Sequence, residues 1–297
     1  MVMKKMAKPI LFLTALIWGS TFTVAKFATE VFSAAFTNAM RFTVATCILV
    51  LVSYPLRKQL DKSYFIHGGL MGITLFGSYM MQTVGLTWDT SPGKSAFLST
   101  TYCVLVPFLY WIVTKEKPKA LHLFCVFLCV SGVGVLSLQG GLGMTSGDIM
   151  TVLSGIPGAA NIVVSSIGCR DRHPLLLTTI ELGVVMVLCW AMVILTGGFP
   201  ETVTVSAVGG VIYLGVFATA LGLFLQSFGL KYTPASIGGM ILSLEAVFGV
   251  ICSIILYKET VTARMTIGFA IIFAAILLSQ TEPEKVKDWF QKKIKKN

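Results

Sequence analysis

Ten apolar stretches of spanning length, separated by short polar gaps, dominate this sequence. A helix that crosses the hydrocarbon core of a bilayer needs about 20 such residues. The stretches fall at 9–29, 36–54, 67–87, 93–113, 121–138, 148–167, 174–196, 207–229, 234–256 and 264–280. The gaps leave no room for a soluble domain. The sequence therefore predicts an all-α integral membrane protein with ten transmembrane helices.

The scarcity of charge also points to lipid as the solvent. Of the 297 residues, 12% are charged and 55% are hydrophobic, whereas a soluble domain carries roughly a quarter charged residues. The net charge of +10 would suit nucleic acid. However, the Lys and Arg residues gather in the short gaps and at both termini, where basic residues set orientation in a membrane. We expect membrane lipid as a partner and no nucleic acid.

The placement of basic residues predicts that both termini are cytoplasmic. With the N-terminus inside, ten spans return the C-terminus to the same side, and only Lys258 and Arg264 lie outside. Lys26, Arg41 and Lys94 fall within spans. We therefore expect a multi-pass protein of a bacterial cytoplasmic membrane. The 18 basic residues on the inner side are Lys4, Lys5, Lys8, Arg57, Lys58, Lys62, Lys115, Lys117, Lys119, Arg170, Arg172, Lys231, Lys285, Lys287, Lys292, Lys293, Lys295 and Lys296.

Two short motifs recur in the second half of the chain. The segment Gln82-Thr-Val-Gly-Leu86 in the third span returns as Gln226-Ser-Phe-Gly-Leu230 in the eighth. The pair Lys115-Glu116 after the fourth span returns as Lys258-Glu259 after the ninth. The chain therefore reads as two copies of one five-helix unit.

Three regions follow from this repeat. We expect a first unit at 1–139, a second at 140–281 and a basic, amphipathic cytoplasmic tail at 282–297. Because five is odd, the second unit must lie inverted relative to the first. Inverted repeats are typical of secondary transporters, whose substrate site lies near the midplane between the copies.

Glu245 is the acidic residue placed deepest in an apolar span. It stands eleven residues from either end of 234–256. A carboxylate there costs several kcal/mol unless it is paired, protonated or in a wet cavity. Because burial disfavours the charged form of a carboxyl group, Glu245 is a candidate proton or cation site. The alternative is a neutral Glu that joins helices by a hydrogen bond.

Other side chains are expected around the same midplane cavity. Tyr102 holds the place in the first unit that Glu245 holds in the second. Aromatic faces near a carboxylate suit a cationic amine, and Glu181 offers a second proton or cation site. Arg41 can extend to water near the outer surface and draw in an anionic group. The predicted substrate-binding residues are Glu245, Tyr102, Trp18, Tyr79, Glu181, Arg41 and Asn161; Asn161 also reads as a polar link between helices.

Other chemistries find no support in the sequence. Gly93-Lys94-Ser95 resembles the end of a phosphate-binding loop, but Trp88 stands where that pattern needs Gly. The spans offer no buried His, no nucleophile–base pair and no channel filter sequence. The seven cysteines are odd in number and lie mostly in apolar runs, as small hydrophobes do. We expect no enzyme activity, no catalytic residue, no metal and no cofactor.

Several segments resemble one transporter family. They are Ala15-Leu-Ile-Trp-Gly-Ser-Thr-Phe22, the pair Arg41-Phe42, and the stretch from Leu244-Glu245 to Lys258-Glu259. The chain resembles the drug/metabolite transporter superfamily over residues 9–280, and within it the EamA family. That resemblance implies export of amino acids and other metabolites, or import of small nutrients, often coupled to protons. The family often has Pro after the equivalent of Glu245, where this chain has Ala246.

These observations together predict a secondary active transporter. We expect it to move a small metabolite, such as an amino acid or a related amine or nutrient, by alternating access. Export is the expected direction, and coupling to protons stays open. The alternative is a proton-coupled uptake symporter for an organic cation or vitamin. Monomer and homodimer are both compatible with the sequence.

Overall fold

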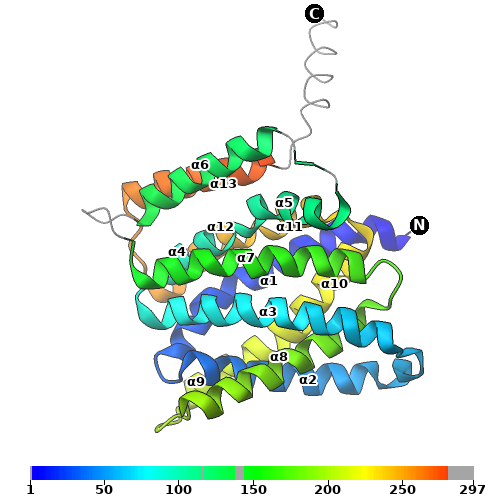
Figure 1. Cartoon of the computed structure of the whole chain (residues 1–297). Coiled ribbons are helices and arrows are strands. Elements are labelled where there is room, and N and C mark those ends of the chain that lie inside the picture. Colours follow the sequence, from blue (N-terminus) through cyan, green and yellow to red (C-terminus); the bar gives the residue numbers. More distant parts are fainter. Residues whose placement is uncertain (1, 116, 119, 138–143, 280–297) are drawn as a thin grey trace, which may run out of the picture.

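The computed structural model describes residues 2–115, 117–118, 120–137 and 144–279. Every regular element within these residues is a helix (Figure 1). The tail expected at 282–297 lies outside the described residues. The helical content therefore confirms the all-α fold class for the part of the chain that is described.

The elements follow one another with short connections (Figure 1). Up to residue 137 they are α1 (Val2–Thr29), α2 (Ala34–Ser53), η1 (Tyr54–Gln59), α3 (Lys62–Trp88), α4 (Pro92–Ser99), α5 (Tyr102–Thr114) and α6 (Ala120–Ser137). From residue 146 they are α7 (Ser146–Gly168), α8 (Pro174–Thr196), α9 (Val205–Tyr213), η2 (Leu214–Leu221), α10 (Gly222–Tyr232), α11 (Ala235–Leu242), α12 (Glu245–Cys252), η3 (Ser253–Tyr257) and α13 (Ala263–Ser279).

Seven helical stretches in the described residues are long and apolar enough to cross a membrane. They are Lys5–Thr29, Ala34–Gln59, Pro92–Thr114, Ser146–Gly168, Pro174–Thr196, Val205–Tyr232 and Ile237–Tyr257. Leu123–Leu136 and Ala263–Leu278 are shorter apolar helices. Large hydrophobic side chains are exposed along these helices, for example Leu195 and Phe127, as lipid-facing side chains are. The chain is a multi-pass helical membrane protein.

Two stretches are each broken in the middle. The first break lies at Thr100 and Thr101, between α4 and α5, and the second at Ser243 and Leu244, between α11 and α12. At both breaks a hydroxyl bonds back to a carbonyl three residues earlier: Thr100 Oγ1 donates to Phe97 O at 2.8 Å and Ser243 Oγ to Met240 O at 2.7 Å. Such bonds compete with the regular helical ladder. The sequence reasoning treated each stretch as one continuous helix and missed the breaks.

Small residues bring the central helices close together. A Cβ on Gly72 of α3 would lie 2.6 Å from Val184 Cβ of α8, so only glycine allows the observed approach of these helices. Tight packing through small residues is the usual way in which membrane helices associate. The helices α6 and α13 pack against each other at one edge of the bundle, beside α5 (Figure 1). The other helices pack around the centre of the bundle (Figure 1).

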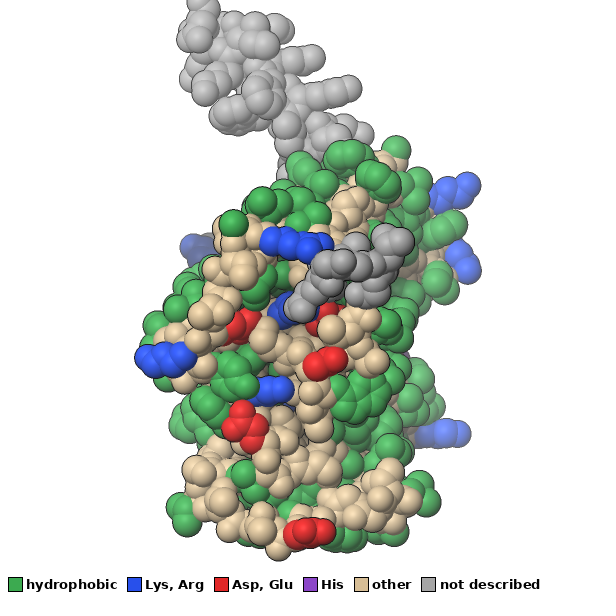
Figure 2. Space-filling model, turned by 90° about the vertical axis from the view of Figure 1, so that its left-hand side faces the viewer, with side chains coloured by type: hydrophobic (Ala, Val, Ile, Leu, Met, Phe, Trp, Pro, Cys, Tyr) green, Lys and Arg blue, Asp and Glu red, His purple; other side chains and the backbone are tan. Residues whose placement is uncertain are grey.

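Polar contacts gather at the two ends of the bundle. At the end that holds the N-terminus, Arg172 Nε donates to Ser63 Oγ at 2.9 Å. At the opposite end, Lys94 Nζ forms an ion pair with Asp148 Oδ2 at 2.5 Å, and the two side chains are 7% and 0% exposed. Figure 2 looks onto this second end, where acidic and basic side chains lie near one another.

Candidate functional site

A cavity lies at the centre of the bundle, between side chains of α1, α3, α7, α10 and the two broken stretches. The space open to the centre of a water molecule is about 60 Å³, several times the roughly 10–15 Å³ that one water needs on this measure. Its lining is mostly apolar, with a few hydroxyls, amides and one carboxylate. The lining residues are Trp18, Thr21, Phe22, Leu75, Ser78, Tyr79, Gln82, Ser99, Tyr102, Gly158, Asn161, Ile162, Gln226 and Glu245.

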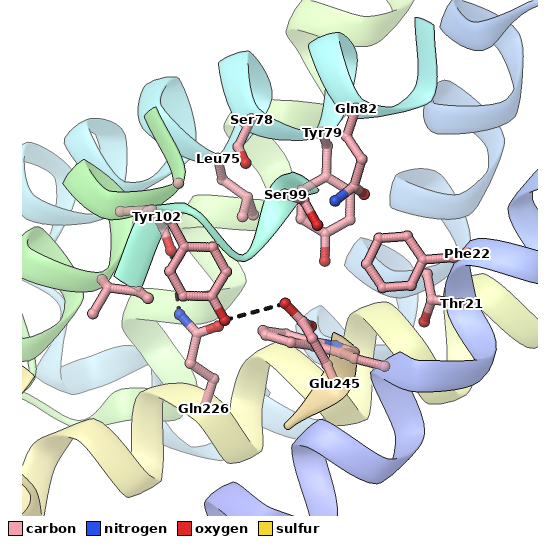
Figure 3. A pocket seen from close by; sticks show the side chains of 14 residues that line it. Thr21, Phe22, Leu75, Ser78, Tyr79, Gln82, Ser99, Tyr102, Gln226 and Glu245 are labelled. Atoms are coloured by element: carbon pink, nitrogen blue, oxygen red, sulfur yellow. Dashed lines mark hydrogen bonds between the residues drawn. The ribbon is translucent and has the colours of Figure 1, made fainter. Parts of the chain in front are cut away.

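Glu245 and Tyr102 meet in this cavity. The Tyr102 hydroxyl donates to Glu245 Oε1 at 3.1 Å (Figure 3). Tyr102 is the first residue of α5 and Glu245 the first residue of α12, so each opens the helix that follows a break. The first N–H groups of α12 donate to carbonyls at the break, for example Ala246 N to Ser243 O at 3.1 Å. The hydrogen bond that the Glu245 carboxylate accepts within the described residues therefore comes from Tyr102.

The aromatic wall of the cavity comes from α1 and α3. Trp18 Nε1 donates to Ala218 O at 2.8 Å, which fixes the indole ring. Gly19 lets α1 approach α12, because a Cβ there would lie 2.3 Å from Phe248 Cβ. Tyr79 extends from α3 with its hydroxyl toward the cavity (Figure 3). Trp18 and Tyr79 therefore line the same cavity as Tyr102 and Glu245.

A chain of amides leads from the cavity to a second buried carboxylate. Gln226 Nε2 donates to Asn161 Oδ1 at 3.2 Å, and Asn161 Nδ2 donates to Glu181 Oε1 at 2.8 Å. Asn161 and Gln226 line the cavity, whereas Glu181 lies behind them and is 1% exposed. Asn161 thus acts both as a link between helices and as a lining residue. The hydrogen bond from Asn161 links Glu181 to the cavity.

Arg41 is placed differently from the expectation. Its side chain is 1% exposed, so the predicted extension to water does not occur. The guanidinium lies 4.8 Å from the ring centroid of Tyr79, and Arg41 Nε donates to Thr219 Oγ1 at 3.0 Å. These two neighbours hold the head group inside the bundle, behind the aromatic wall and outside the cavity lining.

Comparison with known proteins agrees with this architecture. The EamA-like transporter family matches residues 6–138 and, a second time, residues 145–281. The chain belongs to the EamA-like transporter family. It is a transporter of a small-molecule substrate, and the central cavity is the candidate site for that substrate.

Two curated relatives and one solved structure resemble the chain over most of its length. An uncharacterized transporter of Archaeoglobus fulgidus is 32% identical over 268 residues, which cover 90% of this chain and 83% of the relative. The uncharacterized transporter YetK of Bacillus subtilis is 23% identical, over 88% of this chain and 82% of the relative. One solved crystal structure, 18% identical, has a TM-score of 0.65 and covers 92% of this chain and 96% of its own. That structure shares the fold.

The sequence reasoning did not single out several features of this EamA-family transporter. Thr21, Phe22, Ser78 and Ser99 line the cavity, but their residue types are common in any membrane helix and carry no distinct signal. The buried pair of Lys94 and Asp148 was also missed. A signal for it did exist, because each charge stands at the start of a predicted span.

Proposed function

We propose that this chain carries a small metabolite across a bacterial cytoplasmic membrane by alternating access, with Glu245 as the central proton or cation site. The hydrogen bond between Tyr102 and Glu245 at 3.1 Å, inside the central cavity, carries the proposal. It joins the two broken stretches at the point where both are interrupted. The substrate is an amino acid or a related amine or nutrient, and export is the proposed direction.

The proposed architecture is ten membrane helices in two inverted units, at 1–139 and 140–281. The double match to one family, over 6–138 and 145–281, supports it. The backbone supports it as well. Among the described residues, the two non-glycine residues with positive φ are Lys115 at 63° and Lys258 at 58°. These are the lysines of the recurring Lys-Glu pair, and each ends the second part of a broken stretch.

Broken helices at the middle of a bundle fit this mechanism. Transporters with inverted repeats often place substrate and coupling ions at discontinuous helices near the bilayer midplane, where helix ends meet the ligand. Alternating access then follows from rocking of one unit against the other around that site. The excess of basic residues in one set of loops supports cytoplasmic placement of both termini.

The chemistry of the cavity favours a ligand with a positive group. The carboxylate of Glu245 attracts an ammonium group, and the indole of Trp18 and the hydroxyl of Tyr79 line the same cavity. Asn161, Gln226 and Ser99 add polar groups to the cavity lining, and a substrate would compete with the hydrogen bonds that they already make. The same aromatic and acidic set favours the second candidate, a proton-coupled uptake symporter for an organic cation or vitamin.

A ligand screen on purified protein tests the proposal. The thermal midpoint is measured with amino acids, amines, nucleosides and vitamins, because a ligand that binds the native state at 100 times its Kd adds about 2.7 kcal/mol of stability. Compounds that stabilise the protein are then tested for exchange in proteoliposomes. We expect hits that carry an amino group, that exchange, and that lose affinity in Glu245→Gln. Hits that bind Glu245→Gln as tightly as wild type would contradict the proposal.

A further inference from the structure

A guanidinium with an unused donor is buried directly behind the cavity wall. Arg41 Nε has Thr219 Oγ1 as its acceptor, but the buried Nη2 atom has no hydrogen-bond partner within the described residues. The ion pair found among the described residues is that of Lys94 and Asp148. Arg41 is therefore not paired with a carboxylate in the described part of the chain.

A charge in this position needs an anionic partner. Removing an ion from water costs several kcal/mol even after relaxation, and pairing must offset that cost. The rings of Tyr79 and Phe42, whose centroids lie 4.8 and 5.6 Å from Arg41 Cζ, offset part of it. A ring face, however, gives Nη2 no lone pair in the plane of the guanidinium. That plane is suited to a carboxylate, which accepts two parallel N–H bonds.

A second unused donor lies on the same helix face. Thr37 stands one turn before Arg41 on α2, and side chains four residues apart share a face. Its hydroxyl is buried and without a hydrogen-bond partner among the described residues. A guanidinium N–H and a hydroxyl together form a donor set that an anion can use.

The position of Tyr79 connects this donor set to the cavity. The Tyr79 ring is packed against Arg41, while its hydroxyl points into the cavity (Figure 3). Asn38 Nδ2 donates to Tyr79 O at 3.3 Å, which ties α2 to α3 at this level. An anionic group at Arg41 is thus one aromatic ring away from the space where Glu245 meets a cation.

We propose that Arg41 and Thr37 form an anion subsite beside the cavity, which takes a carboxylate-sized anionic group. This inference rests on the proposed function and narrows its substrate to an amphoteric molecule, with the anionic group at Arg41 and the cationic group at Glu245. Such a substrate brings no net charge into the buried centre, so it avoids the cost of an unbalanced charge there. A free anion such as chloride could accept the same hydrogen bonds as the carboxylate of a substrate. The test below distinguishes a free anion from the anionic group of a substrate.

The test measures thermal stability of the purified full-length protein. Sodium acetate, sodium chloride and sodium gluconate are compared at equal ionic strength, because the five hydroxyls of gluconate disfavour its entry into a buried site. In parallel, 5-aminopentanoate is compared with butylamine, and 6-aminohexanoate with pentylamine. Each amine lacks only the carboxylate, and the chain of each amino acid separates its two charged groups enough to pass an aromatic ring. We expect saturable stabilisation by acetate and chloride but not by gluconate. We also expect each amino acid to act at a concentration at least tenfold lower than its amine.

Arg41→Gln should abolish the anion response and bring amino acid and amine to the same half-effective concentration. Arg57→Gln is the matched control, since Arg57 also lies over a tyrosine ring, 3.8 Å from the centroid of Tyr54, but is exposed. It should keep the wild-type responses. If Arg41→Gln does not fold, Arg41→Lys replaces it, and we expect at least fivefold weaker acetate binding because Lys lacks the planar pair of donors.

Each remaining outcome decides the inference. A chloride and acetate response that depends on Arg41, without preference for amino acids over amines, supports the anion subsite and assigns it to a free anion. Equal behaviour of acetate and gluconate, or an acetate response unchanged in both Arg41 variants, overturns it. The thermal stability assay does not depend on transport. If an amine is exchanged but no anion stabilises the protein, the anion subsite is overturned and the proposed function is not. An anion response without exchange of any compound leaves the subsite and overturns the proposed function.

Discussion

The hydroxyl of Tyr102 donates to Oε1 of Glu245 at 3.1 Å, although 143 residues separate them in the chain. Each residue opens a helix after a break, so the interruption of α4–α5 and that of α11–α12 face each other across one cavity. The two residues are 8% and 5% exposed. This contact couples the two halves of the chain at the site where we propose that substrate and proton bind.

Tyr102→Phe should weaken ligand binding and leave the fold intact. The change removes one hydrogen bond to a buried carboxylate but keeps the ring. A hydrogen bond to a charged group is worth about 1.5–3 kcal/mol, so we expect at least tenfold lower affinity in a thermal titration with a compound from the screen. Tyr213→Phe is the control, because its hydroxyl bonds Ser20 at 2.7 Å and does not line the cavity. Equal losses in both variants would contradict a special role for Tyr102.

Gly72→Ala should destabilise the protein, whereas Gly69→Ala on the same helix should not. A methyl at Gly72 would meet Val184 of α8, while one at Gly69 has nothing within 4 Å. Overpacking costs typically about 1–3 kcal/mol, and an open glycine-to-alanine change in a helix gains up to about 1 kcal/mol. The thermal midpoints of the two variants should therefore shift in opposite directions. Similar midpoints would mean that α3 and α8 do not pack through Gly72.

The buried pair of Lys94 and Asp148 should behave as a coupled unit. Removing one member of a buried ion pair leaves an uncompensated charge and costs about 3–5 kcal/mol. We expect Lys94→Met and Asp148→Asn each to lower stability strongly, and the double variant to lower it by clearly less than the sum. Chemical denaturation of all four proteins in one detergent measures the coupling. Strict additivity would show that the pair is not formed.

Membrane orientation has a direct test with a reporter that is active only in the cytoplasm. With both termini inside, the reporter should be active after Asn297 and when inserted at 57–62. It should be silent when inserted at 198–204. Activity at 198–204 would overturn both the orientation and the reasoning from basic residues that predicts it.

The sequence alone predicted much of the site, because membrane burial makes polar residues conspicuous. Glu245, Tyr102, Trp18, Tyr79 and Asn161 were predicted to bind substrate, and all five line one cavity. Their role in binding remains a prediction. Glu181 and Arg41 were also predicted, but each lies behind a lining residue. Whether these two side chains line the cavity or lie behind it depends on how each helix is rotated about its axis. A span that is apolar on all sides has no periodic pattern that shows this rotation.

The sequence did not reveal the two helix breaks or the ion pair of Lys94 with Asp148. At both helix breaks a hydroxyl bonds to the carbonyl three residues back, but Ser20 and Ser154 make the same bond inside unbroken helices. The presence of Ser or Thr in a span therefore does not predict a break. The contact of Lys94 with Asp148 joins residues 54 positions apart. To predict this contact from the sequence, one would need to know that α4 and α7 are neighbours.

Gradient-driven uptake by Glu245→Gln in proteoliposomes tests the central claim most directly. Gln keeps the size and polarity of a protonated Glu, so the variant should fold and insert, but it has no proton to exchange. With a substrate from the screen and an imposed proton gradient, we predict at least a tenfold loss of accumulation, while exchange without a gradient continues. Glu181→Gln, measured beside it, shows whether the second carboxylate shares the role. Accumulation by Glu245→Gln at the wild-type rate would contradict the claim that Glu245 couples transport to protons.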